Sequence, residues 1–284
     1  MNPNHLLILT AVCAILALAI HTICRKKNWT IQRRLGRNKG IPSPTSEGGL
    51  VFLLGFLVCL AYSSSFIDRD ILLSPAEMKS RHLGLALALI WTWAAGRFVD
   101  SKNLSHLYTT AVLTIGAAIA TAFGFRIETL RVGETVFEIG WMSIPGTLLW
   151  FVVISEFFRL LDGLDGLQML GVGAAVSAQI WILEPEEGYA LLLCYSLLPV
   201  LIGLFPWRIY PARIELKGIG AYLPGFIFGA ITLVGRQKAF TTKAVLLPSI
   251  VLFAVFSLFA LWLLEQHLFP QKGGGRRERV GESD

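Results

Sequence analysis

Charged residues are scarce in this 284-residue sequence. Asp, Glu, Lys and Arg make up 15% of it, whereas a typical soluble domain is about one quarter charged. Hydrophobic residues make up 54%, and the mean hydropathy is +0.62. These values exclude an ordinary soluble domain, and the repeated apolar runs of about 17–25 residues have the length of membrane-crossing helices. The composition therefore predicts a polytopic membrane protein.

Several familiar motifs are also missing. The four cysteines lie in or beside apolar runs without C-x-x-C spacing, so neither a zinc site nor a disulfide framework is indicated. The sequence has no G-x-x-x-x-G-K-[ST] motif and no useful G-x-G-x-x-G motif, which argues against a nucleotide-driven pump. The first apolar run lacks a basic segment before it and an A-x-A site, unlike a cleavable signal peptide. The formal charge of +6 follows from the basic loops on one side of the membrane, so we expect no nucleic-acid partner.

The apolar runs predict an all-α fold with about nine transmembrane helices, at 5–24, 49–67, 83–99, 105–124, 141–158, 166–183, 188–205, 219–235 and 243–268. Of the 25 Lys and Arg residues, 17 lie in or beside alternate connections beginning with 25–48, and 8 belong to the opposite connections. Because positive charge collects on the cytoplasmic side, we expect the N-terminus outside and the C-terminus inside. We expect a single transmembrane domain over 1–269 and a polar, disordered cytoplasmic tail over 270–284.

One connection differs from the others in its pattern. In "FRIETLRVGETVFEIGW", residues 125–141, apolar and polar residues roughly alternate around Gly133-Glu134. This alternation, with a turn signal in the middle, is typical of two paired strands. We predict a short outward-facing β-hairpin near 125–141.

The segment "FFRLLDGLDGLQML", residues 157–170, places charges between two apolar runs. Glu156, Arg159, Asp162 and Asp165 are spaced by three, and two nearby glycines interrupt a continuous helix. One interpretation is structural: Asp162 or Asp165 caps the next helix, with Arg159 paired to Glu156 and Asp162. The other is functional, because ionisable groups at membrane depth are costly and commonly mark a working site.

The motif D-G-L-D-G-L, with its surroundings, resembles a known family. The sequence is similar to polyprenyl-phosphate N-acetylhexosamine-1-phosphate transferases (glycosyltransferase family four), which include the phospho-MurNAc-pentapeptide translocase. The resemblance covers about 39–260 and includes "KGIPSPTSEGGLVFLLGF", "GRFVDSKNLS" and "PARIELKGIGAYLPGFIFGAI". It implies phosphoryl transfer: polyprenyl (undecaprenyl) phosphate attacks the β-phosphate of a UDP-N-acetylhexosamine, giving polyprenyl-pyrophospho-sugar and UMP in cell-envelope glycan synthesis.

The resemblance also implies roles for particular residues. Asp100, Asp162 and Asp165 would form the acidic catalytic site, with Asp100 and Asp162 binding Mg²⁺ or Mn²⁺. Four basic residues would bind substrate, namely Lys39, Arg159, Arg213 and Lys217. The implied location is the cytoplasmic (inner) membrane of a bacterium, with the motif loops facing the cytoplasm, and a homo- or heterodimer is left open.

The sequence departs from the family pattern at positions that carry charge. The family's D-D is Asp100-Ser101 here, its M-G-D ends in Gly218, its two asparagines are Glu156 and Arg159, and its histidine-rich loop has no counterpart. Three hypotheses follow: an active, divergent transferase; a homologue that binds polyprenyl phosphate or partners an active transferase without catalysis; and a transporter. Clustering of the charges at helix ends rather than at mid-span argues against the transporter.

Overall fold

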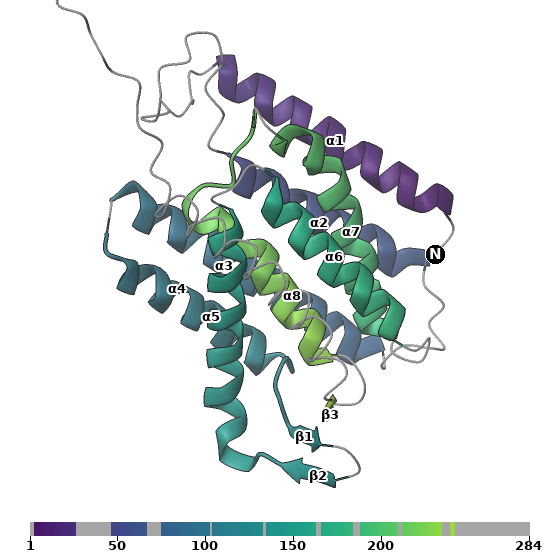
Figure 1. Cartoon of the computed structure of the whole chain (residues 1–284), viewed down its shortest axis with the longest axis vertical. Helices are drawn as coiled ribbons and strands as arrows, with labels where there is room; N and C mark the ends of the chain where they lie inside the picture. The colour runs from purple at the N-terminus through teal and green to yellow at the C-terminus, as the bar shows by residue number, and fades with distance from the viewer. Residues whose placement is uncertain are drawn as a thin grey trace, which may run out of the picture.

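The computed structural model describes residues 3–26, 47–66, 75–102, 104–132, 135–162, 166–183, 188–209, 212–234 and 239–241. Most of these residues are helical (Figure 1). The helices are α1 (Pro3–Lys26), α2 (Gly48–Phe66), α3 (Pro75–Ser101), α4 (His106–Ala122), α5 (Ser143–Leu161), α6 (Leu167–Ile182), α7 (Gly188–Arg208) and α8 (Leu223–Val234). Two 3₁₀ turns, η2 (Gly140–Met142) and η3 (Gly218–Tyr222), precede α5 and α8. The predicted helical fold is confirmed.

Eight of the nine predicted spans coincide with these helices. Five are long and apolar enough to cross a membrane, namely Asn4–Cys24, Gly48–Ser65, Ala76–Ser101, Gly140–Leu161 and Gly188–Arg208. Three are shorter apolar helices, namely His106–Ala122, Leu167–Ile182 and Gly218–Val234. The ninth, at 243–268, and the tail at 270–284 lie outside the described residues. The chain is thus a multi-pass membrane protein, while the count of nine and the orientation stay predictions.

The helices pack around α7 and α8. The long helix α7 packs against α1, α2 and α6. Helix α8 packs against α5, and α3 packs against α4. Figure 1 shows α5 crossing the direction of the other helices. Aromatic rings join α5 to α8: Phe151 stacks on Phe226 with 4.6 Å between ring centroids, and Phe158 meets Phe228 edge-on at 5.5 Å. This packing fixes the position of α8, and with it η3, against α5.

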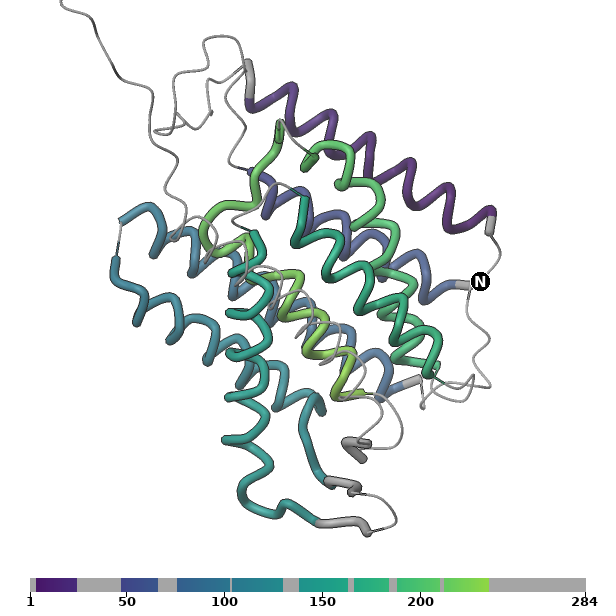
Figure 2. The backbone as a smooth tube through the Cα atoms, viewed as in Figure 1, coloured from purple at the N-terminus to yellow at the C-terminus, as the bar shows by residue number. Residues whose placement is uncertain are grey.

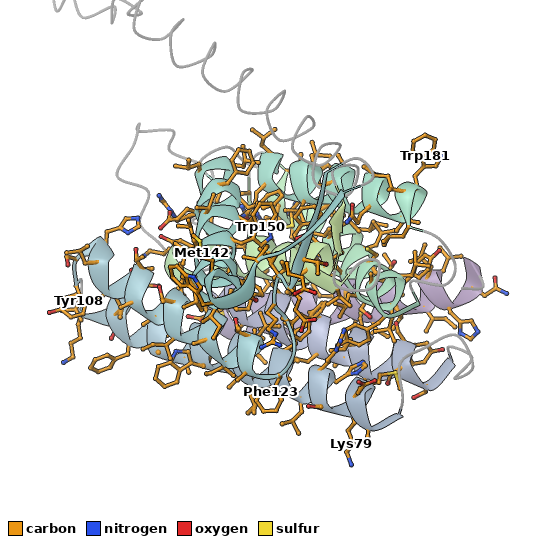
Figure 3. All side chains as sticks on the ribbon, turned by 90° about the horizontal axis from the view of Figure 1, so that it is seen from below. Lys79, Tyr108, Phe123, Met142, Trp150 and Trp181 are labelled. Carbon is orange, nitrogen blue, oxygen red and sulfur yellow. The ribbon has the colours of Figure 1, made fainter. Side chains whose placement is uncertain are left out.

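The outer surface carries large apolar side chains. Leu7 and Ile15 of α1 are 68% and 64% exposed, and Trp181 at the end of α6 projects away from the bundle (Figure 3). A surface of this kind would be unfavourable in water. It is expected where helices face lipid and aromatic rings lie near the membrane boundary.

A small sheet lies beside the start of α5 (Figure 1). Strands β1 (Thr129–Val132) and β2 (Thr135–Glu138) pair antiparallel, within the range predicted for a hairpin, and their outward orientation stays a prediction. A third strand, β3 (Ala239–Thr241), pairs parallel with β1. The sequence prediction missed β3, because parallel pairing between distant segments leaves no local turn signal.

At the opposite end of α5, segments far apart in the sequence meet. The Gly48 N–H donates to the Glu215 carbonyl at 3.1 Å, so the start of α2 lies against the connection from α7 to α8. A Cβ atom at Gly49 would come within 2.7 Å of the Gly220 Cα, and only glycine permits this approach. Figure 2 shows the connection passing beside the end of α5. We call this end of the bundle the site end.

Candidate functional site

A cavity of about 280 Å³ opens at the site end. The lining comes from α3, α4, the end of α5 with its C-cap residue, and η3. It consists of Asp100, Thr109, Arg159, Asp162, Gly218, Ala221 and Tyr222. Three of the predicted site residues therefore meet in one place: Asp100 comes from α3, and Arg159 and Asp162 come from the end of α5. This volume lies near the lower end of the range of about 300–1,000 Å³ that is common for small-molecule sites.

Asp100 lies over the backbone of Gly218. Its Oδ2 accepts a hydrogen bond from the Ile219 N–H at 2.9 Å, which satisfies a backbone donor near the start of η3. Gly218 has φ +57°, and a Cβ there would lie 2.0 Å from Asp100 Oδ2. The carboxylate of Asp100 thus occupies the space that a side chain at 218 would need. Asp100 binds backbone in addition to lining the cavity.

Asp162 forms an ion pair with Arg208. The Nη2 atom of Arg208 donates to Asp162 Oδ1, and the Arg208 side chain is only 3% exposed. Arg208 Nη1 also donates to the Ile214 carbonyl at 3.5 Å. Removing one member of a buried pair leaves the other charge uncompensated, so the pair holds the end of α5 to the end of α7.

The structural interpretation of the aspartates is wrong for Asp162. The N-cap of α6 is Gly166, with φ +85° and no side-chain cap, and Asp162 is instead the C-cap of α5. Glycine adopts the αL conformation of this N-cap readily, and it offers no side chain to cap the helix. The predicted pairing of Arg159 with Glu156 is confirmed, at 2.8 Å between Nε and Oε2.

Arg159 supplies positive charge to the cavity. Its guanidinium carbon lies 5.4 Å from the centroid of the Tyr222 ring, within the range of a cation–π contact. Its partner Glu156 also has His106 Nε2 3.3 Å from Oε1. Glu156 accepts the Nε–H of Arg159, so this bond leaves the terminal N–H groups of the guanidinium unused.

Lys217 holds an uncommon backbone conformation at the cavity rim. It is the one non-glycine residue with positive φ in the described part of the chain, at +38°, and its side chain is exposed. It lies close enough to Asp100 to act on its charge, as does Arg97. Such conformations are unfavourable by about 1–3 kcal/mol and cluster at functional sites.

Two other predicted site residues in the described part of the chain, Arg213 and Lys217, are not in the cavity lining. Arg213 is exposed on the connection between α7 and α8, where its N–H donates to the Trp207 carbonyl at 2.9 Å. Lys39 and Asp165 lie outside the described residues. Their roles therefore stay predictions.

Sequence reasoning missed several residues of the site. Arg208 was read only as loop charge, although an arginine that ends the apolar run "GLFPWR" is a signal for a buried partner. Gln168, fully buried, donates from Nε2 to the carbonyls of Phe158 and Ala221 at 3.0 and 2.5 Å. It ties α5 to η3 and so shapes the cavity. Thr109 and Tyr222, which line the cavity, had no recognisable local pattern.

Among the described residues, the negative charge of the cavity carboxylates is already partly compensated. Asp162 is already neutralised by Arg208, Asp100 accepts a backbone N–H, and Arg159 brings positive charge into the same cavity. Over the ranges that the structure describes, no group of three or more His, Cys, Asp or Glu is placed to hold a metal ion. Because Mg²⁺ is usually held by one or two carboxylates together with waters and substrate phosphates, the predicted divalent cation stays a prediction.

Comparison with known proteins places the chain in a family. The model of glycosyl transferase family 4 matches residues 82–236. The chain belongs to this family. The matched range runs from α3 to just beyond α8 and contains all the residues that line the cavity. Membership in glycosyl transferase family 4 confirms the resemblance carried by the D-G-L-D-G-L segment.

Individual relatives of the glycosyl transferase family 4 are similar at modest identity. A probable undecaprenyl-phosphate N-acetylglucosaminyl 1-phosphate transferase of Bacillus subtilis (strain 168) is 32% identical over 159 residues, covering 54% of this chain and 44% of that protein. The phospho-N-acetylmuramoyl-pentapeptide-transferase of Limosilactobacillus reuteri (strain DSM 20016) is 23% identical over 198 residues, 66% of this chain and 59% of that protein. The chain spans about half the length of these relatives.

Proposed function

We propose that this protein transfers a sugar 1-phosphate from a UDP-N-acetylhexosamine to polyprenyl phosphate at the cytoplasmic face of the membrane. The observation that carries the proposal is the convergence of Asp100, Arg159 and Asp162 on one cavity, inside the range matched by the family model. The names of the two relatives support a polyprenyl-phosphate acceptor and an N-acetylated amino sugar. The excess of Lys and Arg on one set of connections supports the cytoplasmic face, where UDP-sugars are found.

The proposed reaction is an in-line displacement at phosphorus. An oxygen of the lipid phosphate attacks the β-phosphorus of the UDP-sugar, and a new P–O bond forms. The bond from the β-phosphorus to its bridging oxygen breaks, and UMP leaves with the bonding electron pair. Such chemistry depends mainly on positioning and on stabilising charge at the phosphoryl oxygens.

The cavity residues have groups suited to these tasks. The Arg159 guanidinium can donate to phosphoryl oxygens, and Asp100 has a second carboxylate oxygen to accept a proton from a monoprotonated lipid phosphate. The ion pair between Asp162 and Arg208 keeps the ends of α5 and α7 in place. The divalent cation expected from the resemblance stays a prediction, and no step above uses it.

Release of UMP tests the proposal. The full chain would be reconstituted in nanodiscs with undecaprenyl phosphate, a panel of UDP-N-acetylhexosamines, and Mg²⁺, Mn²⁺ or EDTA. Asp100→Asn is the informative variant, because asparagine can still accept the Ile219 N–H while losing the charge. We expect UMP release by the wild type and a loss of roughly 10²-fold or more in the variant. Equal release by both proteins would show that Asp100 has no catalytic role.

A second candidate function is to bind polyprenyl phosphate, or to partner an active transferase, without transferring sugar phosphate. Neutralisation of Asp162 by Arg208 and the glycine at 218 favour it. In the same nanodiscs this alternative predicts binding of undecaprenyl phosphate with no UMP from any donor under any cation condition. UMP release that depends on Asp100 would exclude it.

A further inference from the structure

Four of the described carboxylates at the site end each have a cation beside them. The carboxylates are Glu47, Asp100, Glu156 and Asp162, and the cations are Arg97, Arg159, Arg208 and Lys217. Three of these cations are ion-paired with one carboxylate each, and Lys217 lies near Asp100. A cation-binding cavity needs an excess of negative charge, which is missing from this set.

The positions that differ from the family motif fit the same balance. By the resemblance, Ser101 and Gly218 stand where the family motif has aspartates, which implies two fewer negative charges than in that motif. Two negative charges are what one divalent cation would compensate. Arg159, in place of an uncharged residue, then faces the cavity from α5.

One of these cations lines the cavity, and a second is the chain neighbour of a lining residue. Arg159 lines it, and its side chain is one-third exposed, at 33%. Lys217 precedes Gly218, which lines the cavity, and its side chain is exposed. Arg208, by contrast, is buried and committed to Asp162 and the Ile214 carbonyl. A guanidinium in the lining and an ammonium on an adjoining residue are both groups that bind phosphate oxygens.

We infer that the cavity binds a phosphate or diphosphate group directly through Arg159 and Lys217, without requiring a divalent cation. The inference rests on the proposed function, since it names how the phosphate-bearing substrate is held there. The group belongs either to the nucleotide donor or to the lipid acceptor, and competition between the two distinguishes them.

The test measures binding of inorganic pyrophosphate to the full chain by isothermal titration calorimetry, in nanodiscs of zwitterionic lipid containing EDTA. We expect binding in EDTA, and an affinity that changes by less than about threefold when Mg²⁺ replaces EDTA. Loss of one charged hydrogen-bond donor should weaken binding roughly 10- to 100-fold in Arg159→Gln. Displacement of pyrophosphate by UDP would assign the site to the donor, and displacement by undecaprenyl phosphate to the acceptor.

The chain offers a matched control. Arg126 pairs with Glu128 at 2.9 Å near the β-hairpin, almost the geometry of Arg159 with Glu156 at 2.8 Å. Arg126→Gln removes a similar ion pair away from the cavity and should leave pyrophosphate binding unchanged. Lys217→Gln changes an exposed side chain, so it tests the inference even if Arg159→Gln fails to fold, and it should weaken binding roughly threefold to tenfold.

Two results would overturn the inference. One is pyrophosphate binding that appears only with Mg²⁺, and the other is binding in EDTA that neither Arg159→Gln nor Lys217→Gln weakens. The proposed function fails separately, by absence of UMP release. Pyrophosphate binding in EDTA without UMP release would support the anion site and contradict the transferase function. UMP release with pyrophosphate binding only in Mg²⁺ would support the transferase function and contradict the metal-independent anion site.

Discussion

The two ends of α5 hold their ion pairs in different ways. At the site end, Arg208 pairs with Asp162 across 46 positions of sequence, and its side chain is 3% exposed. At the hairpin end, Arg126 pairs with Glu128 two positions away, and its side chain is 48% exposed. A buried pair between distant segments fixes how helices lie relative to one another, whereas an exposed local pair contributes little. The site end is therefore where substitutions of charge should be costly.

The largest effect is expected from Arg208. The substitution Arg208→Met leaves Asp162 without its buried partner and should lower the free energy of unfolding by about 3–5 kcal/mol. Thermal and denaturant unfolding of the detergent-purified chain would measure this. Adding Asp162→Asn to the same chain removes the uncompensated charge and should restore part of the loss. Additive losses in the double variant would show that the two side chains do not act as a pair.

The second-largest loss of unfolding free energy is expected from a substitution of Gly218. This substitution tests how tightly the site end is packed. In Gly218→Ala the new methyl group meets the Asp100 carboxylate, and φ +57° is unfavourable for alanine. We expect a loss of about 2 kcal/mol in unfolding free energy, from the backbone strain and the lost bond to the Ile219 N–H. In an Asp100→Ala background the steric part should vanish. An equal loss in both backgrounds would mean that Asp100 does not occupy this space.

The pair of Arg97 with Glu47 lies between the two extremes. Glu47 is 7% exposed and Arg97 is 43% exposed, with 2.5 Å between Nη2 and Oε1. Because water reaches the arginine side, Arg97→Gln should cost about 1 kcal/mol of unfolding free energy. The same unfolding measurement applies. If Arg97→Gln lowered the unfolding free energy more than Arg208→Met does, burial of an ion pair would not determine how much its loss destabilises the protein.

The smallest effect is expected at the hairpin end. Arg126→Gln removes an exposed pair and should change the unfolding free energy by less than about 0.5 kcal/mol. High salt should leave even this small difference undetectable, because exposed charges are screened. A loss of 2 kcal/mol or more would erase the contrast between the two ends.

Sequence patterns were reliable where a single segment carries the signal. Long apolar runs predicted α1 to α8, because length and composition alone decide whether a helix can lie in a bilayer. The alternation at 125–141 predicted strands where β1 and β2 pair. The spacing of Glu156 and Arg159 predicted their ion pair, because residues three apart are neighbours on a helix.

Signals that depend on two distant segments were not readable. The sequence predicted Asp162 either as a helix cap or as part of an acidic site, and only the fold shows Arg208 beside it. Gln168 looked like an ordinary polar residue after a glycine-rich turn, yet it bridges α5 and η3. The strand β3 likewise found its partner β1 only in three dimensions.

The sequence by itself determined that the chain lies in a membrane as helices, that it resembles one transferase family, and that charge collects around D-G-L-D-G-L. These properties follow from composition and local order, which need no knowledge of contacts. Only the tertiary structure decided which charges compensate one another. Coulomb interactions depend on distance and burial, and these are set by the packing of α3, α5, α7 and η3 rather than by position along the chain.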